Sequence, residues 1–370
     1  MVYAITGHVQ NYAWGVPGGF NEWLPTPADN SPQADDSPQA ELWFGVHPNG
    51  PSPLRDAPGT LADVVAATEV PLLVKVMAAA APLSIQIHPP AEMAAELHAA
   101  GSPLVADPLG KIELLIALQP FAVLAGWRDE EEAAVLLADT DPALAAVAAA
   151  VRAHDALSAV RQLLALPTDE VTRMVPAFLQ SASTHLGYEE LRAYALCAES
   201  YPGDPGVLVA GLLNFRLLEP GHGVFMPPGG IRAYIQGFGL EVMNSSDNVF
   251  RLGMTNKPLA VEEGLAAVAE SGEPHYLSGE VYINHGHPVE TEFHPHGAPF
   301  TVDLLRRSAI TSDTGFYRCV VALGEETTVT VGAETMVLHQ GEACVVLADE
   351  VDADVTTTGA AAVARARVPR

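Results

Sequence analysis

The pattern of apolar and polar positions changes twice along the chain. Up to residue 125, short apolar runs such as 71–77 stand among prolines, glycines and aromatic residues. In Ile85–His88 apolar and polar residues alternate, and this period of two predicts a strand with one polar face. From Asp129 to residue 166 the chain is rich in Ala and Leu at helical spacing. The acidic residues that open this block stand where a helix N-terminus favours negative charge.

Prolines and a second change of pattern set the limits of the helical block. Pro142 and Pro167 divide it into separate helices, and a further helix is expected over 189–200. After residue 206 strand-like segments return. From about residue 279 short apolar segments alternate with turns, which is typical of an all-β sandwich or barrel.

These patterns predict a mainly β fold with a helical insertion. We expect a first β domain formed by residues 1–125 and 206–278, an all-helical inserted domain over residues 126–205, and a C-terminal β-barrel-like domain over residues 279–370.

Composition narrows the class of function. The 370 residues carry 45 acidic and 18 basic side chains, a formal net charge of −27, which argues against nucleic-acid binding and against a polybasic membrane-binding surface. No apolar stretch is long enough to predict a membrane span. Three widely spaced cysteines predict no disulfide framework and favour a cytoplasmic location. The sequence holds no pattern that sets an oligomeric state.

Two short segments carry candidate chemistry, and each has two interpretations. Gln86 and His88 would share one face of a strand and could bind zinc, or they could form a hydrogen-bonded polar pair at a strand end. Lys111 and Glu113 would share a face if their segment is a strand, and an exposed pair of this kind is usually a solvated salt bridge.

The third segment, residues 227–257, predicts a Pro/Gly turn, two paired strands and then a Ser-Asp-Asn motif. Glu241 and Asp247 supply carboxylates, and Arg251 and Lys257 supply cations. A small phosphorylated substrate would need such cations. A surface charge network is the alternative interpretation.

At these segments the chain resembles the type I mannose-6-phosphate isomerases, which are zinc enzymes of the cupin superfamily. The resemblance lies in NYAWG (11–15), AELWFGVHP (40–48), PLLVKV (71–76), PLSIQIHP (82–89), KIE with the following AL (111–118), LLNFRLLEPG (212–221), GLE (239–241) and SDNVFRLGMTNK (246–257). It implies a cupin (jelly-roll) barrel for the first β domain. It also implies interconversion of mannose 6-phosphate and fructose 6-phosphate through a cis-enediol, with a small-molecule sugar phosphate as the partner.

The resemblance further implies roles for single residues. One zinc ion per chain is expected, with the ligands Gln86, His88 and Glu113. The catalytic residues are expected to be Arg251, Glu241, Asp247 and Lys111, with Glu241 or Asp247 as the base or proton relay. The substrate-binding residues are expected to be Lys257, Ser84 and Lys75, joined by Arg232, which adds a cation to the pocket.

Two positions depart from the family pattern. Arg232 stands where the family has its fourth zinc ligand, a histidine, and Gly110 stands where the family usually has another histidine. Arginine has no lone pair for a metal and stays protonated. Arg232 could swing out of the pocket, or pair with Glu113 as a substitute for the metal's charge.

Three functions are therefore compatible with the sequence. The first is a mannose-6-phosphate isomerase with a weakened or remodelled metal site. The second is a family member that acts on another sugar phosphate, with Arg232 in place of zinc. The third is a non-catalytic cupin that binds a sugar phosphate and has lost zinc.

Overall fold

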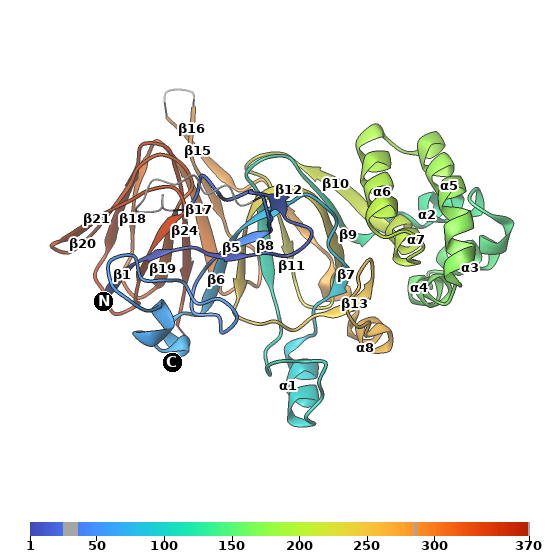
Figure 1. Cartoon of the computed structure of the whole chain (residues 1–370), viewed down its shortest axis with the longest axis horizontal. Coiled ribbons are helices and arrows are strands. Elements are labelled where there is room, and N and C mark those ends of the chain that lie inside the picture. The colour runs from blue at the N-terminus through green and yellow to red at the C-terminus, as the bar shows by residue number, and fades with distance from the viewer. Residues whose placement is uncertain (25–35, 285–286, 369–370) are drawn as a thin grey trace.

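The computed structural model describes residues 1–24, 36–284 and 287–368, and it confirms a mainly β fold with a helical insertion. Three parts follow one another along the long axis of the molecule (Figure 1). The C-terminal strands lie at one end, the first β domain lies in the middle, and the helices lie at the other end.

An eleven-stranded sheet forms the first β domain. Its strands are β2 (His8–Gln10), β5 (Glu41–Phe44), β6 (Leu72–Ala79), β7 (Ile85–Ile87), β8 (Glu113–Ala117), β9 (Phe121–Trp127), β10 (Leu213–Leu218), β11 (Gly223–Met226), β12 (Ile231–Asn244), β13 (Phe250–Gly253) and β14 (His275–Leu277). The main path runs β14-β11-β8-β12-β6-β5-β2, and a branch joins β13, β7, β12, β9 and β10. The predicted strand around Ile85 is therefore present as β7.

Strand β12 joins the two branches of this sheet. The sequence suggested two paired strands here, but the structure has one strand of 14 residues. Its first part pairs with β7 and β9, and its second part, from Gly237, pairs with β6 and β8. The change of partner strands falls at Gly237. A side chain there would collide with Phe121, because an added Cβ would lie 2.5 Å from its ring. Local alternation could not distinguish one strand with two sets of partners from two strands.

The helical insertion lies against the β10, β12 and β13 side of the sheet. Its helices are α2 (Glu130–Ala138), α3 (Ala145–Arg152), α4 (Ala156–Leu164), α5 (Thr168–His185) and α6 (Tyr188–Ser200), and the short α7 (Gly206–Val209) follows just beyond the predicted boundary at residue 205. The carboxylate of Asp129 caps α2 by accepting hydrogen bonds from the backbone of Glu131 and Glu132, as the acidic run predicted. Two further helices, α1 (Ala91–Ala99) and α8 (Val261–Ala267), pack beside the first β domain.

The C-terminal part is built from two sheets. A seven-stranded sheet contains, in spatial order, β1 (Val2–Thr6), β22 (Glu342–Val346), β19 (Tyr317–Ala322), β24 (Ala360–Ala366), β17 (Phe300–Arg306), β16 (His287–Phe293) and β15 (Glu280–Asn284). A four-stranded sheet contains β18 (Ala309–Ser312), β23 (Ala353–Thr357), β20 (Thr327–Val331) and β21 (Glu334–Leu338). A two-stranded ribbon, β3 (Val16–Pro17) and β4 (Pro38–Gln39), completes the strands among the described residues.

The N-terminal strand and the core tie the two β parts together. Strand β1 pairs with β22, so residues 2–6 extend the C-terminal sheet. The large sheets share one hydrophobic core, in which the Phe225 and Phe300 rings meet with centroids 6.5 Å apart. Among the described residues, no helix has both the length and the apolar character that a membrane crossing needs.

A buried carboxylate in β17 makes stability depend on pH. Asp303 is 1% exposed, and the Arg365 guanidinium donates to its Oδ1 at 3.0 Å. Burial raises the pKa of Asp303 to about 7, against the opposing effect of Arg365. An unfolded aspartate ionises near pH 3.9. Between these values the folded state retains a proton that the unfolded state has lost, so the free energy of unfolding falls as pH rises.

Asp303→Asn is expected to remove this pH dependence. Between pH 5 and pH 8 the free energy of unfolding of the unmodified chain should fall by about 2–3 kcal/mol more than that of the variant. The reason is that about two pH units lie between pH 5 and the pKa of Asp303. Urea unfolding at both pH values measures the difference. The exposed Asp313 provides the control. A plot of unfolding free energy against pH for Asp313→Asn should run parallel to that of the unmodified chain. Parallel curves for Asp303→Asn would contradict the assignment.

Candidate active site

One pocket in the first β domain gathers the predicted site residues. It encloses about 130 Å³, which is small beside typical ligand pockets, so a bound ligand would extend through its opening. Ten of the eleven predicted residues line it: Lys75, Ser84, Gln86, Lys111, Glu113, Arg232, Glu241, Asp247, Arg251 and Lys257. The eleventh, His88, is 1% exposed and contacts Arg232 from behind the lining.

Strand β7 places two arginines beside Gln86. Gln86 is directly opposite Arg232 on β12 and directly opposite Arg251 on β13. Opposed residues on neighbouring strands project from the same face of a sheet. The three side chains therefore form a row across three strands, and the Gln86 amide donates to Ser84 Oγ at 2.9 Å.

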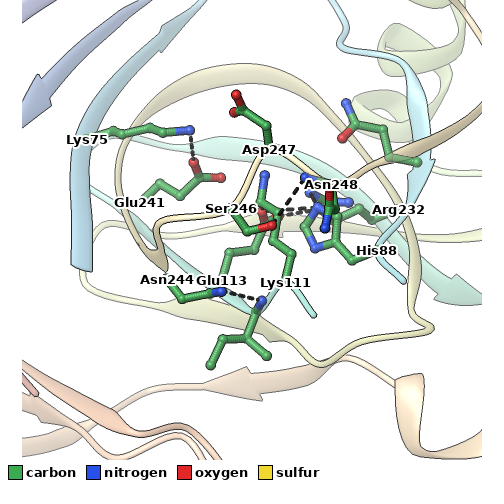
Figure 2. Close-up of polar contacts among 12 residues, drawn as sticks. Lys75, His88, Lys111, Glu113, Arg232, Glu241, Asn244, Ser246, Asp247 and Asn248 are labelled. Carbon is green, nitrogen blue, oxygen red and sulfur yellow. Dashed lines mark hydrogen bonds and ion pairs between the residues drawn. The ribbon is translucent and has the colours of Figure 1, made fainter. Parts of the chain in front are cut away.

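The guanidinium of Arg232 lies between His88 and Glu113 (Figure 2). Its Nε donates to Glu113 Oε1, and one Nη lies 2.6 Å from His88 Nε2. Because every guanidinium nitrogen is a donor, His88 Nε2 must accept, so the imidazole is neutral with its proton on Nδ1. Burial, reinforced by Arg232, holds the pKa of His88 well below its usual value. Of the two conformations predicted for Arg232, the structure has the one paired with Glu113.

Glu113 is the centre of this buried cluster. It is fully buried, and the Tyr234 hydroxyl donates to its Oε1 at 2.7 Å. Burial alone would raise the pKa of Glu113. The adjacent cations, of which Arg232 has the largest effect, outweigh burial and hold this pKa well below its usual range. The sequence interpretation missed Tyr234, although it stands two residues beyond Arg232 on the same face of β12.

The donors in this cluster do not fit a zinc ion. Zinc would need the lone pairs of His88 Nε2 and a Glu113 oxygen at about 2.0–2.2 Å. Arg232 nitrogens occupy His88 Nε2 and Glu113 Oε1, which leaves Glu113 Oε2 as the one oxygen of that carboxylate without a hydrogen bond to a described residue. In the described ranges, no group of three His, Cys, Asp or Glu side chains is arranged to hold a metal.

A second buried cluster surrounds Lys75. Its ammonium donates to Glu241 Oε2 at 2.8 Å and lies 3.7 Å from Glu41 Oε2 (Figure 2). The indole of Trp43 donates to Glu41 at 2.6 Å. Burial raises the pKa of Glu241, and the Lys75 ammonium opposes the rise. Glu241 is thus a buried carboxylate with one directly bonded cation.

Lys111 and Glu113 do not form an exposed pair, so that interpretation was wrong. Strand β8 begins at Glu113, and Lys111 lies before it. The Lys111 ammonium lies 3.7 Å from Glu113 Oε2, and both side chains are buried. The side chain of Asn244 holds this segment by hydrogen bonds to the backbone of Gly110 and Ile112.

Gly110 is a position without room for a side chain. A Cβ there would lie 2.7 Å from the backbone nitrogen of Ala91, at the start of α1. The family's histidine could not be accommodated here unless α1 moved. The loss of that histidine is therefore linked to the placement of α1.

The Ser-Asp-Asn motif divides into a structural part and a pocket part. Ser246 Oγ and Asn248 Nδ2 bind Asp107 and so hold its loop. Asp247 faces the pocket, where its Oδ2 lies 3.3 Å from His47 Nε2 and accepts a 3.0 Å bond from Asn49. His47 lowers the pKa of Asp247. Sequence reasoning missed His47, although it lies within the AELWFGVHP segment.

Two cations of the pocket have no carboxylate partner. Among the described residues, no ion pair is formed by Arg251 or Lys257, and the Lys257 ammonium lies 5.3 Å from the Tyr12 ring centroid. The lining holds five cations, Lys75, Lys111, Arg232, Arg251 and Lys257. It holds four carboxylates, Glu41, Glu113, Glu241 and Asp247. The pocket is thus locally cationic in a chain of net charge −27 and can accept an anion.

Comparisons with known proteins agree with the resemblance. The family model "Phosphomannose isomerase type I, catalytic domain" matches residues 2–130. Mannose-6-phosphate isomerase of Escherichia coli is 31% identical, with 96% of this chain and 97% of that protein covered. The human mannose-6-phosphate isomerase is 30% identical, with 69% and 70% covered.

Solved structures match over nearly the whole chain. The H99A mutant of phosphomannose isomerase from Salmonella typhimurium has a TM-score of 0.83 at 27% identity, with 99% of each chain covered. A zinc-bound mannose 6-phosphate isomerase has a TM-score of 0.81 at 27% identity, also with 99% of each chain covered. Zinc, which the resemblance implied, is therefore present in a solved relative. The identities and coverage together show that this chain belongs to the type I mannose-6-phosphate isomerase family.

Proposed function

We propose that this chain interconverts mannose 6-phosphate and fructose 6-phosphate by moving a proton between C1 and C2 of the open-chain sugar through a cis-enediol. The observation that carries the proposal is the polarity of the pocket. The lining combines two cations without a carboxylate partner, Arg251 and Lys257, with a buried carboxylate, Glu241. Family membership supports the same reaction.

The unpaired cations suit the phosphate end of the substrate. A phosphate dianion forms strong charge-assisted hydrogen bonds with guanidinium and ammonium groups. Lys257 is the more exposed of the two, and Arg251 is half-buried on β13 beside Gln86. We assign Lys257 to the phosphate. Arg251 lies deeper, where it can also stabilise negative charge that develops on the sugar.

Glu241 is a better base than Asp247. A base for a C–H proton gains from a pKa near the operating pH. Burial raises the pKa of Glu241, whereas the hydrogen bond with His47 lowers that of Asp247. Lys75 and Lys111 complete the polar floor of the pocket, where they can hold hydroxyl groups in register.

Lys257→Met is expected to weaken phosphate recognition. KM for mannose 6-phosphate and Ki for inorganic phosphate should both rise about 10- to 100-fold, because a hydrogen bond to a charged group contributes about 1.5–3 kcal/mol. Initial rates with and without phosphate measure both constants. Arg216→Met is the matched control, because Arg216 lies over the Tyr276 ring outside the pocket, and it should leave both constants unchanged. An equal loss of kcat/KM for unphosphorylated mannose would contradict the assignment.

A direct assay of the purified chain tests the activity itself. Turnover of mannose 6-phosphate to fructose 6-phosphate is the expected result. Turnover only with a different sugar phosphate would favour the member repurposed for that substrate. Tight sugar-phosphate binding without any turnover would favour the non-catalytic cupin.

Two further expectations remain proposals. The division into residues 1–125 with 206–278, 126–205 and 279–370 is supported by the separate sheets and the helical block, with β1 added to the C-terminal part. A cytoplasmic location is supported by Cys197, Cys319 and Cys344, which are all free and buried.

A further inference from the structure

We infer that the Arg232 guanidinium replaces a metal ion in this pocket and binds the sugar's carbonyl oxygen in its place. The first half, replacement of the metal, stands on the geometry of Arg232, His88 and Glu113. The second half, binding of the carbonyl oxygen, rests on the proposed isomerisation.

Arg232 and a metal ion would compete for the same atoms. The guanidinium bonds Glu113 Oε1 and His88 Nε2 at once, and His88 Nε2 has only one lone pair. A metal on His88 would have to displace Arg232 from a side chain that is 1% exposed. The displaced guanidinium would then leave a buried arrangement in which it is itself only 4% exposed.

Arg232 also supplies the charge that the cluster needs. Glu113 is fully buried, and a buried carboxylate is costly without a cation beside it. Arg232 donates a direct hydrogen bond to the Glu113 carboxylate, and the Lys111 ammonium lies 3.7 Å from Glu113 Oε2. A divalent ion added to these two cations would meet strong repulsion in a site of low dielectric constant.

One nitrogen of Arg232 remains for the substrate. Nη1 is buried and has no hydrogen-bond partner in the structure, although Arg232 lines the pocket. Buried donors are normally paired, so this nitrogen is available to an acceptor atom of a ligand that enters the pocket. A carbonyl or enediolate oxygen is an acceptor of the required kind.

The strand pairing places Arg232 on the same face of the sheet as a second cation, Arg251. Arg232 and Arg251 stand on either side of Gln86, two strand spacings or roughly 10 Å apart along the sheet. Their side chains lie on one face, so a small sugar phosphate can meet both. Arg232 would contact the reacting end while Arg251 contacts the side nearer Lys257.

The proposed step balances without a metal. In the direction from mannose, Glu241 removes the proton from C2, the C2–H electron pair forms the C1=C2 bond, and the carbonyl π pair moves to O1. Arg232 Nη1 donates a hydrogen bond to the negative O1 and remains protonated. The hydroxyl proton of O2 then passes to O1, which leaves the negative charge on O2. An O2 electron pair forms the C2=O2 bond while the C1=C2 π pair takes the proton held by Glu241 at C1, which gives the ketose.

Metal analysis of tag-free protein tests the first half. After incubation with zinc and gel filtration, we expect less than about 0.1 zinc per chain, and no change in melting temperature on adding zinc or a chelator. Arg232→His, which restores a ligand, should bind about one zinc per chain and melt at a higher temperature with zinc. One zinc per unmodified chain, removed by a chelator with loss of activity, would overturn the inference.

Kinetics test the second half. Turnover by the unmodified chain should persist in a chelator, and Arg232→Lys should lower kcat at least 10-fold with a smaller change in KM, because a lysine cannot bridge His88 and Glu113 and also reach O1. An unchanged kcat would overturn this half. A chain that binds no zinc and turns over no sugar phosphate would overturn the proposed function while leaving the replacement of the metal supported.

Discussion

Glu241→Gln is expected to lower kcat for the isomerisation by about 10²- to 10⁴-fold, the usual contribution of a positioned general base. Glutamine keeps the shape of the side chain and an oxygen that can accept the 2.8 Å hydrogen bond from Lys75. It cannot take a proton from carbon. The fold should survive, and KM should change little.

The pH profile and isotope exchange measure this effect. Because the base must be ionised, kcat should fall as pH drops through the pKa of Glu241, which burial raises above that of an exposed glutamate. Exchange of the C2 hydrogen with solvent should be lost with turnover. Asp247→Asn is the matched control and should mainly alter KM. If Asp247→Asn abolished turnover and Glu241→Gln did not, the two roles would have to be exchanged.

Arg318→Leu is expected to cost about 3–5 kcal/mol of unfolding free energy, because it removes a buried charge whose two terminal nitrogens bind five backbone carbonyls. Arg318 is 0% exposed on β19. Its guanidinium donates to the backbone carbonyls of Ser312, Asp313, Leu347, Glu350 and Val351 at 2.8–3.3 Å. Leucine would fill part of the space and leave these carbonyls without that donor.

Denaturant unfolding followed by circular dichroism measures the loss. Arg152→Leu is the matched control, because Arg152 is exposed and its ion pair with Glu131 is on the surface. That change should cost less than about 1 kcal/mol. A loss below 1 kcal/mol for Arg318→Leu would show that water or a rearranged loop satisfies the five carbonyls.

The outline of the fold was predictable because its signals are local. The alternation around Ile85 marks β7, and the acidic residues after Asp129 mark the start of α2. Helix and strand periods show in neighbouring residues, so they need no knowledge of distant contacts. The family motifs likewise named a set of residues that the structure gathers in one pocket.

The partners of each side chain were not predictable in the same way. Lys111 and Glu113 looked like an exposed pair because nothing near them in sequence shows that β8 is buried on both faces. The role of His47 became visible only when Asp247, 200 residues later, was found 3.3 Å from it. Such contacts depend on how the sheet order brings distant strands together.

The sequence by itself determined the family, the mainly β architecture with its helical insertion, and the presence of an arginine where the relatives have a histidine. The tertiary structure decided what that arginine does. Arg232 faces Glu113, which lies 119 residues earlier, and His88, which lies 144 residues earlier. Arg232 is opposite Gln86 of β7, whereas Glu113 is opposite Met243 near the other end of β12, so local strand pairing does not explain their contact. The path of the whole sheet brings the three groups together, and burial favours their pairing, because an unpaired charge there would be costly.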